Sequence, residues 1–382
     1  MNKIKIITIF GTRPEAIKMA PLVRELNNMP EIQNKVCVTA QHRQMLDQVL
    51  ELFNITPDFD LNIMKTKQSL TGITTRVLSG LEEIFDKEKP DLILVHGDTT
   101  TTFAGALAAF YKKIKVGHVE AGLRTHDKYF PFPEEMNRKL TGAIADMHFA
   151  PTTGAKENLK KEGVDEKNIF VTGNTVIDAM KYTVQQHYVF ENEELNKIDY
   201  EGKKVIMVTA HRRENWGKGI ENICDALKNI VESNEDVELV YLVHLNPVVR
   251  DVVYSKLQNV PRVHLLPPLD TKETHNLMNK CFMVMTDSGG LQEEAPHLGK
   301  PVLVLRNVTE RPEAVKAGTV KLIGTDKDNI IKNGNELIRN KNEYERMSRA
   351  VNPYGDGLAS KRITEAILYY FGMRENCFKE FV

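Results

Sequence analysis

Acidic side chains and a histidine follow directly after several short apolar runs of this chain. Asp98 and Glu120 each come just after a valine-containing run, and Glu134 opens a helical stretch after a proline-braced loop. His211 follows a further apolar run in the second half of the chain. Three carboxylates and an imidazole at such positions resemble the groups that proteins tune for proton transfer. We therefore expect acid–base chemistry, including removal of a proton from carbon.

Glu134 and His211 also have purely structural interpretations. Glu134 or Glu135 would stabilise the start of the helix that they open, because carboxylates favour the positive end of a helix. His211 would cap a helix or lie in an interface. Convergence of the four groups at one site favours the catalytic interpretation, and it leaves open which carboxylate is the base.

A second set of residues has the chemistry of an anion site. Ser288, Gly289 and Gly290 stand where a strand turns into a helix. Backbone N–H groups without side chains can approach a phosphate there, at the positive end of the helix dipole. Glu294 has the reach to accept hydrogen bonds from a ribose, and Arg311 adds a fixed positive charge. The alternative is a tight turn capped by Ser288, with Glu294 on a solvated face.

Two cations in the first half of the chain predict a further phosphate contact. Arg13 precedes Pro14, which suits the first position of a helix, and Lys18 lies about one turn onward. The alternative for Lys18 is an exposed helix lysine. A diphosphate carries enough charge for both halves of the chain to hold it.

The elements that position these residues alternate between short apolar strands and amphipathic helices. This alternation indicates βαβ units and a parallel sheet in each half, with ligands bound beyond the carboxyl ends of the strands. We expect strands at 4–10, 35–40, 91–96, 115–120, 146–150, 204–210, 237–243, 262–265, 281–286, 301–305 and 320–323, and helices at 14–28, 44–53, 70–87 and 360–371.

The length of the chain predicts two domains. At 382 residues it exceeds the size at which a single core stops growing, about 250 to 300 residues. We expect an N-terminal Rossmann-like domain at 1–172 and a C-terminal Rossmann-like domain at 173–363. The last segment, 364–382, is expected to pack back on the first domain.

Composition and missing motifs exclude several function classes. A formal net charge of −1 gives no general attraction to nucleic acid or to a membrane, and the apolar run 3–10 is too short for a membrane span. The widely spaced cysteines form no ligand cluster, which indicates a cytoplasmic location and no metal. The sequence also lacks the glycine fingerprint of NAD enzymes, the P-loop, the serine-hydrolase elbow and the zinc-protease pair, so we expect no such cofactor.

Seven motifs of the chain resemble those of the bacterial and archaeal non-hydrolysing UDP-N-acetylglucosamine 2-epimerases. They follow one another in order between residue 4 and about residue 325. They read FGTRPEAIK (10–18), HGDTT (96–100), HVEAGLR (118–124), PEEMNR (133–138), TAHRREN (209–215), DSGG (287–290) and RPEA (311–314).

The resemblance implies a GT-B architecture, in which two Rossmann-like, doubly wound parallel-sheet domains enclose a cleft. It implies reversible C2 epimerisation of UDP-N-acetylglucosamine to UDP-N-acetylmannosamine. The mechanism would be anti elimination of UDP to 2-acetamidoglucal followed by re-addition, without NAD or metal. The product would feed cell-surface polysaccharide synthesis, and the protein would be a cytoplasmic homodimer.

Site residues are implied by position. The catalytic set would be Asp98, Glu120, Glu134 and His211, and His275 stands about where the family often has an aromatic near uracil. A second UDP-N-acetylglucosamine would act as an allosteric activator. The UDP contacts would be Arg13, Lys18, Ser288, Gly289, Gly290, Glu294 and Arg311, and the activator contacts Gln41, Gln44, Arg213 and His244.

Three other functions share parts of this pattern. A GT-B glycosyltransferase would use the same nucleotide clamp and pass the sugar to an acceptor. A hydrolysing relative would release N-acetylmannosamine and UDP, but it is usually fused to a sugar kinase, which this sequence lacks. A nucleotide-sugar sensor would bind without turnover, which the set of three carboxylates and a histidine disfavours.

Overall fold

The computed structural model describes residues 3–40, 43–65 and 68–381, and it divides into two compact units. Unit 1 comprises Met1–Ala179 and Tyr354–Val382, and unit 2 comprises Met180–Pro353. The boundaries expected from the sequence were 172/173 and 363/364. The chain instead passes into unit 2 inside helix α7 (Thr175–Thr183). A boundary within a continuous helix has no loop or change of composition to mark it.

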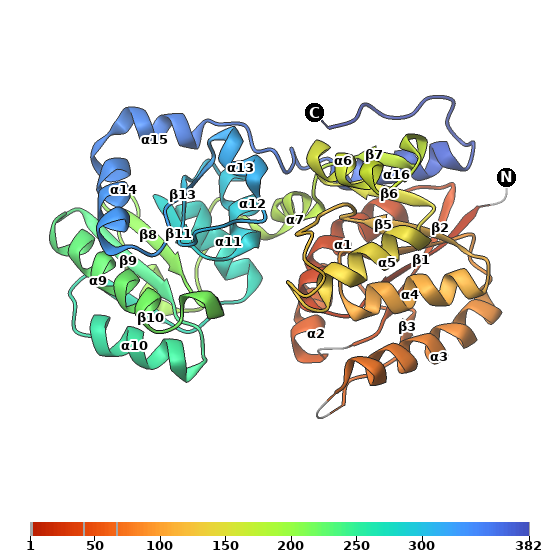
Figure 1. The fold of residues 1–382 in the computed structure, drawn as a ribbon, viewed down its shortest axis with the longest axis horizontal. Helices are drawn as coiled ribbons and strands as arrows, with labels where there is room; N and C mark the ends of the chain where they lie inside the picture. The colour runs from red at the N-terminus through yellow and green to blue at the C-terminus, as the bar shows by residue number, and fades with distance from the viewer. Residues whose placement is uncertain (1–2, 41–42, 66–67, 382) are drawn as a thin grey trace. The chain divides into compact units, whose positions relative to one another are not determined.

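The described residues of unit 1 form a parallel sheet in the order β3-β2-β1-β4-β5-β6-β7 (Figure 1). The chain order reverses between β1 and β4, so this is the switch point at which doubly wound sheets bind ligands. The strands are β1 (Ile4–Phe10), β2 (Ile32–Val38), β3 (Phe59–Asp60), β4 (Leu92–His96), β5 (Lys115–Val119), β6 (Met147–Ala150) and β7 (Ile169–Val171). The helices besides α7 are α1 (Arg13–Asn27), α2 (Arg43–Leu52), α3 (Leu70–Glu88), α4 (Thr100–Tyr111), α5 (Glu134–Ile144), α6 (Thr153–Lys161), the 3-10 turn η1 (Glu166–Asn168) and α16 (Ala359–Tyr370).

The described residues of unit 2 repeat this design with strand order β10-β9-β8-β11-β12-β13 and a switch point between β8 and β11. The strands are β8 (Lys204–Thr209), β9 (Val237–Leu242), β10 (Val263–Leu266), β11 (Met283–Thr286), β12 (Val302–Val304) and β13 (Val320–Leu322). The helices are α8 (Glu193–Asn196), η2 (Arg213–Asn215), α9 (Lys218–Glu232), α10 (Pro247–Leu257), α11 (Thr271–Lys280), α12 (Gly289–His297), α13 (Pro312–Ala317), α14 (Lys327–Arg339) and α15 (Lys341–Ser348).

These elements confirm the expected α/β class and each expected strand and helix to within three residues. Strands β3 and β7 were not predicted. They have two and three residues, which is too short for a period to be read.

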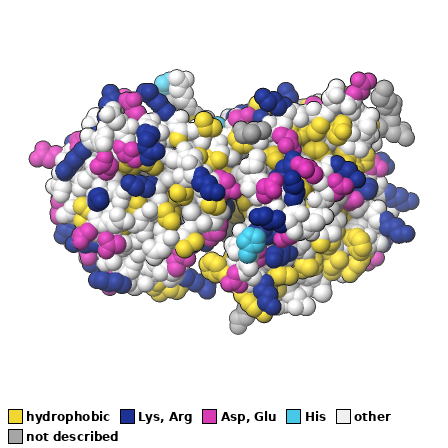
Figure 2. All heavy atoms as spheres, turned by 45° about the horizontal axis from the view of Figure 1, so that its top comes forward, with side chains coloured by type: hydrophobic (Ala, Val, Ile, Leu, Met, Phe, Trp, Pro, Cys, Tyr) yellow, Lys and Arg dark blue, Asp and Glu magenta, His cyan; other side chains and the backbone are white. Residues whose placement is uncertain are grey.

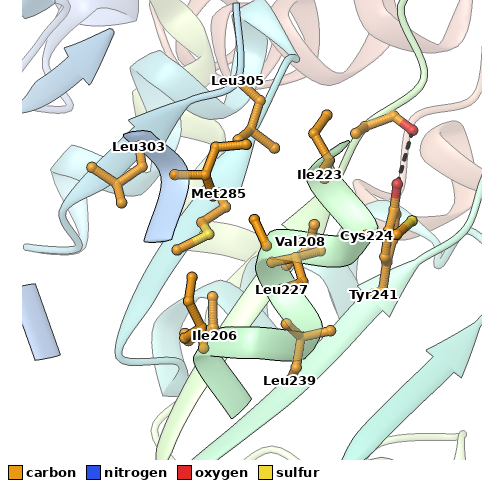
Figure 3. Close-up of a cluster of buried hydrophobic side chains, with 14 of the residues drawn as sticks. Ile206, Val208, Ile223, Cys224, Leu227, Leu239, Tyr241, Met285, Leu303 and Leu305 are labelled. Atoms are coloured by element: carbon orange, nitrogen blue, oxygen red, sulfur yellow. Dashed lines mark hydrogen bonds between the residues drawn. The ribbon is translucent and has the colours of Figure 1, made fainter. Parts of the chain in front are cut away.

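A buried apolar layer between sheet and helices holds unit 2 together (Figure 3). Leu227 and Ile223 of α9 pack on Val208 of β8 and Tyr241 of β9, all of them inaccessible to solvent. The Tyr241 hydroxyl is also buried, and it donates to the carbonyl oxygen of Ala210 over 3.3 Å. This contact pins the segment that leads into His211.

The C-terminal helix belongs to unit 1, where α16 packs on α1 (Figure 1). Its start is capped by the buried carboxylate of Asp178, which accepts from the backbone N–H groups of Ala359 and Ser360 over 3.1 and 2.8 Å. The segment 359–371 therefore completes the first unit after the chain has left the second.

The surface carries mixed charges. Figure 2 shows Lys and Arg side chains interspersed with Asp and Glu over the face in view. Among the described residues, no helix has both the length and the apolar character that crossing a membrane requires.

Candidate active site

One buried carboxylate fastens the two loops at the switch point of unit 1. Glu15 accepts from the backbone N–H groups of Gly11 and Thr12 over 3.1 and 2.8 Å, and from the hydroxyl of Thr99 over 2.7 Å. Gly11 and Thr12 follow β1, whereas Thr99 follows β4. Glu15 thereby fixes Arg13 and Asp98, which lie in these loops.

Glu120 lies at the centre of a small polar cluster at the end of β5. Its Oε2 atom forms an ion pair with Nζ of Lys18 and accepts from Nδ2 of Asn174 over 2.8 Å. Nε2 of His96 lies 3.7 Å from the same oxygen. The Glu120 side chain is only 9% exposed, and its backbone has a φ of 62°, a left-handed conformation that costs about 1 to 3 kcal/mol in a residue other than glycine.

His96 is the buried member of this cluster. Burial lowers the pKa of its imidazole to about 4, helped by the charge of Lys18 and opposed by those of Glu120 and Asp98. The ring is therefore neutral near pH 7. Its Nε2 atom has no hydrogen-bond partner within the described part of the chain.

The other two expected carboxylates of unit 1 differ in their partners. Asp98 forms an ion pair of 2.5 Å with Arg138. Glu134 is the first residue of α5, and its buried Oε2 atom has no hydrogen bond to any described residue. The neighbouring Glu135 is fully buried and accepts from the backbone N–H groups of Thr125 and His126, so it is the structural member of the pair.

Arg13 and Lys18 have different surroundings although both lie on the first turns of α1. Arg13 is half-buried and forms no ion pair with a described residue. Lys18 pairs with Glu120. The guanidinium of Arg13 thus has its charge available for an anion, while the ammonium of Lys18 already neutralises a carboxylate.

A buried carboxylate also fastens the switch point of unit 2. Asp287, which is inaccessible to solvent, accepts from the backbone N–H groups of His211 and Arg212 over 2.8 Å each and from Nδ2 of Asn215 over 2.9 Å. Its other oxygen lies 3.4 Å from Nδ1 of His211. Asp287 follows β11 and His211 follows β8, so the contact spans the switch point.

The His211 imidazole is half-buried and stacked on a second imidazole. Its ring centroid lies 5.4 Å from that of His244, with the planes 11° apart. Burial lowers the pKa of His211, as do the neighbouring His244 and Arg212, whereas Asp287 raises it. His211 is therefore a neutral ring whose Nδ1 side faces a carboxylate.

The start of α12 has the shape of an anion cradle. Ser288 is its N-cap residue, and the hydroxyl makes no capping hydrogen bond. A side chain added at Gly289 would lie 3.5 Å from the guanidinium of Arg311, so this charge stands beside a bare backbone. Nε of Arg311 donates to the buried Glu293 over 2.6 Å. Gly290 follows with similar access, limited by Glu294 at 3.2 Å from its added Cβ.

Glu294 is held from the inner side by a buried histidine. Nε2 of His275 lies 3.4 Å from Oε2 of Glu294, and its Nδ1 shares a 2.6 Å hydrogen bond with the hydroxyl of Thr183. His275 is 2% exposed. The sequence left open what His275 does where the family often has an aromatic near uracil, and a ring this deeply buried offers no face on which a base could stack.

Comparisons with known proteins place the chain in a family. The family model described as UDP-N-acetylglucosamine 2-epimerase matches residues 24–368. A relative from Clostridium acetobutylicum is 75% identical over 381 residues, covering 100% of this chain and 99% of that protein. The UDP-N-acetylglucosamine 2-epimerase of Bacillus subtilis is 58% identical over 375 residues, covering 98% of each.

The chain belongs to the UDP-N-acetylglucosamine 2-epimerase family. The solved structure of the Neisseria meningitidis UDP-GlcNAc 2-epimerase bound to UDP-GlcNAc is similar, with a TM-score of 0.87, 51% identity and coverage of 96% of this chain and 100% of that one. The two doubly wound sheets and such matches confirm the expected GT-B fold class and the expected enzyme class, an isomerase of this family.

Within this epimerase-family chain, a buried arginine joins two site loops of unit 2. Arg306 is 3% exposed and forms ion pairs with Glu214 at 2.6 Å and with Glu310 at 2.7 Å. Burial disfavours the charge of Glu310, but the hydrogen bonds and charge of Arg306 outweigh it and lower the pKa of Glu310 to about 2. The loop of His211 and the loop of Arg311 are thereby tied to one guanidinium.

The residues expected to bind an activator are only partly described. Gln41 lies outside the described residues, as does the side chain of Gln44. Arg213 is exposed, with its guanidinium 5.9 Å from the centroid of the Trp216 ring, and His244 is exposed and stacked on His211. Across residues 3–40, 43–65 and 68–381, no group of three or more His, Cys, Asp or Glu is arranged to hold a metal ion.

Proposed function

We propose that the protein interconverts UDP-N-acetylglucosamine and UDP-N-acetylmannosamine by anti elimination of UDP and its re-addition to 2-acetamidoglucal. The observation that carries this is the division of chemistry between the units. In unit 1, carboxylates with cationic or imidazole neighbours lie at the switch point. In unit 2, the glycines that begin α12 lie beside Arg311, which Glu293 holds in place. Membership in the epimerase family supports the reaction class.

The reaction breaks two bonds on one sugar. A carboxylate takes the proton from C2, and the C2–H electron pair forms the C1–C2 double bond while UDP leaves C1 with the pair of the C1–O bond. The C2 proton has no neighbouring carbonyl and is barely acidic, so its removal depends on the departure of UDP. Each step transfers a proton or breaks or forms a C–O bond heterolytically, and none transfers a hydride, so we propose that no NAD takes part. We also propose that the reaction needs no metal.

Epimerisation requires a proton to leave from one face of the sugar and return to the other. Two acid–base groups are the simplest way to serve two faces, and unit 1 offers the three carboxylates Asp98, Glu120 and Glu134. General acid–base groups typically contribute about 10²- to 10⁴-fold to a rate. Lys18 and Arg138 form ion pairs with Glu120 and Asp98 and would orient these two carboxylates.

Departure of UDP requires donors where the phosphate charge develops. The Ser288 hydroxyl, the backbone N–H groups of Gly289 and Gly290, and Arg311 would supply them in unit 2. Arg13, with its unpaired charge among the described residues, would add a contact from unit 1. His211, whose Nδ1 faces Asp287, would lie beside the leaving oxygen.

Proton NMR of UDP-N-acetylglucosamine with the protein in deuterated water tests this reaction. We expect the C2 proton signal to disappear and both epimers to carry deuterium at C2. Glu120→Gln protein serves as the control for contaminating activity.

The same spectra separate the competing functions. A retained C2 proton with sugar transferred to an added acceptor would indicate a glycosyltransferase. Stoichiometric UDP with free N-acetylmannosamine would indicate the hydrolysing reaction. An unchanged substrate that nevertheless binds would indicate a sensor.

We also propose that a second UDP-N-acetylglucosamine activates the enzyme through Gln41, Gln44, Arg213 and His244. The stacking of His244 on His211 supports a route from such a site to the catalytic histidine. Sigmoidal initial rates that become hyperbolic in His244→Ala are expected, and hyperbolic wild-type rates would contradict the proposal.

We further propose that the protein is a homodimer, that it is cytoplasmic, and that its product is used in cell-surface polysaccharide synthesis. Light scattering after gel filtration measures the oligomeric state, and a monomer at micromolar concentration would contradict it. Cell fractionation and analysis of surface polysaccharide in a deletion strain test the other two.

A further inference from the structure

A buried imidazole faces one of the proposed catalytic carboxylates without bonding to it. Nε2 of His96 lies 3.7 Å from Oε2 of Glu120, and the His96 side chain is 4% exposed. Lys18 and Asn174 contact the same oxygen at hydrogen-bonding distance. Among the described residues close to this oxygen, His96 thus differs from Lys18 and Asn174 because its Nε2 atom forms no hydrogen bond.

An unengaged buried nitrogen is costly. Leaving a buried polar atom without a partner is destabilising, whereas an apolar ring of similar shape would avoid this cost. Burial also lowers the pKa of His96 to about 4, so the ring is neutral and not a second cation. A neutral imidazole carries one N–H, and the tautomer with its proton on Nε2 is a donor toward Glu120. Lys18 already neutralises the charge of the Glu120 carboxylate. A neutral N–H can orient that carboxylate without adding a further positive charge.

A second buried histidine also has a ring nitrogen without a hydrogen bond, but its charged neighbours are different. His148 of β6 is 1% exposed, and its Nδ1 atom also has no hydrogen bond to a described residue. Burial lowers the pKa of His148 to about 4 as well. The charged groups that act on it are Arg124, Asp146 and Glu162, none of which belongs to the proposed catalytic set.

We propose that His96 is a positioning residue for Glu120. The Nε2–H group of His96 donates a hydrogen bond to the Glu120 carboxylate when substrate is bound. This rests on the proposed function, because it assigns a partner to one of its acid–base groups. A shift of less than an ångström, from the observed 3.7 Å to the usual hydrogen-bond length of about 3 Å, would complete the contact.

Three substitutions at position 96 test the donor. His96→Phe keeps the ring volume and removes both nitrogens. His96→Gln returns an amide donor at the distance of Nε2, and His96→Asn returns one only at the distance of Nδ1. We expect kcat to fall about 10- to 100-fold in the Phe and Asn variants, to recover to within about threefold in Gln, and KM to change little.

His148→Phe is the matched control, because it also removes a buried neutral imidazole with an unengaged nitrogen. We expect its kcat to equal that of the wild type. Thermal unfolding of all variants shows whether each protein is folded, and kcat is compared only among folded proteins.

Two results would overturn the proposal. One is a folded His96→Phe protein with normal kcat, and the other is a folded His96→Gln protein that is as slow as His96→Phe. The wild type is assayed in parallel by C2 deuteration. If it shows no exchange, the proposed function fails; if it exchanges normally while the variants give either result above, only the role of His96 fails.

Discussion

Unit 1 and unit 2 use the same device at their switch points and then diverge. In unit 1 the buried Glu15 binds the loops after β1 and β4, and in unit 2 the buried Asp287 binds the loops after β8 and β11. Apart from these two buried carboxylates, the side chains at the two switch points differ. Unit 1 presents Glu120 and Asp98, each paired with a cation, whereas unit 2 presents bare backbone beside Arg311.

This difference teaches that the sheet determines where a ligand binds and the loop residues determine what happens to it. If the division is correct, changes at the carboxylates of unit 1 should affect the chemical step, and changes at Arg311 beside α12 should affect nucleotide affinity. Asp287 is the instructive exception, because it fastens a loop and also faces His211.

Glu120→Gln should give the largest effect. The amide cannot accept the proton, so we expect kcat to fall about 10²- to 10⁴-fold, while the Kd of UDP changes less than about twofold. Glu88→Gln removes the partner of Lys35 in another ion pair of unit 1 and should leave kcat unchanged. Calorimetry of UDP binding together with steady-state rates provides both numbers, and a normal kcat with weaker UDP binding would reverse the division.

Arg311→Ala should follow in size. A charge-assisted contact to phosphate is typically worth about 1.5 to 3 kcal/mol, which predicts about 10- to 150-fold weaker UDP binding. Arg346→Ala removes an exposed arginine of the same unit and should not change the Kd. An unchanged Kd in Arg311→Ala would remove that residue from the UDP site.

Asp287→Asn should lower kcat by about tenfold, since the charge that orients His211 disappears. The sign of its pH effect follows from the contacts. Asp287 raises the pKa of His211 against the effect of burial, so its removal should lower that pKa further. If turnover requires a neutral His211, the acidic limb of the kcat profile moves to lower pH, and a limb that stays in place would exclude His211 as the titrating group.

Glu310→Gln should have the smallest effect, on stability alone. The pKa of Glu310 falls from 4.5 to about 2 on folding, so its contribution is complete above pH 4.5 and is lost as the pH falls through about 2. We expect the variant to be about 1 to 2 kcal/mol less stable near neutral pH, after allowance for partial exposure. Urea unfolding at several pH values measures this difference, which should shrink with acidity; a constant difference would rule out titration of Glu310 as its cause.

The sequence predicted what depends on local pattern and missed what depends on tertiary contacts. Apolar runs located the strands that end at His96 and Thr286 because a buried strand needs continuous apolar residues. No local signal identified Asp287 as the partner of His211 across 76 residues, or Lys18 as the partner of Glu120 across 102. The burial of His275 was likewise set by α7 and α12 and not by its neighbours in the chain.

The left-handed backbone of Glu120 also bears on the stability of the protein. Glycine would adopt this conformation without strain, so Glu120→Gly relaxes the main chain while it deletes the carboxylate. The relief of strain would be set against the loss of the ion pair with Lys18 and the hydrogen bond from Asn174. The carboxylate contacts of Glu120 therefore offset a main-chain strain that a glycine at this position would not carry.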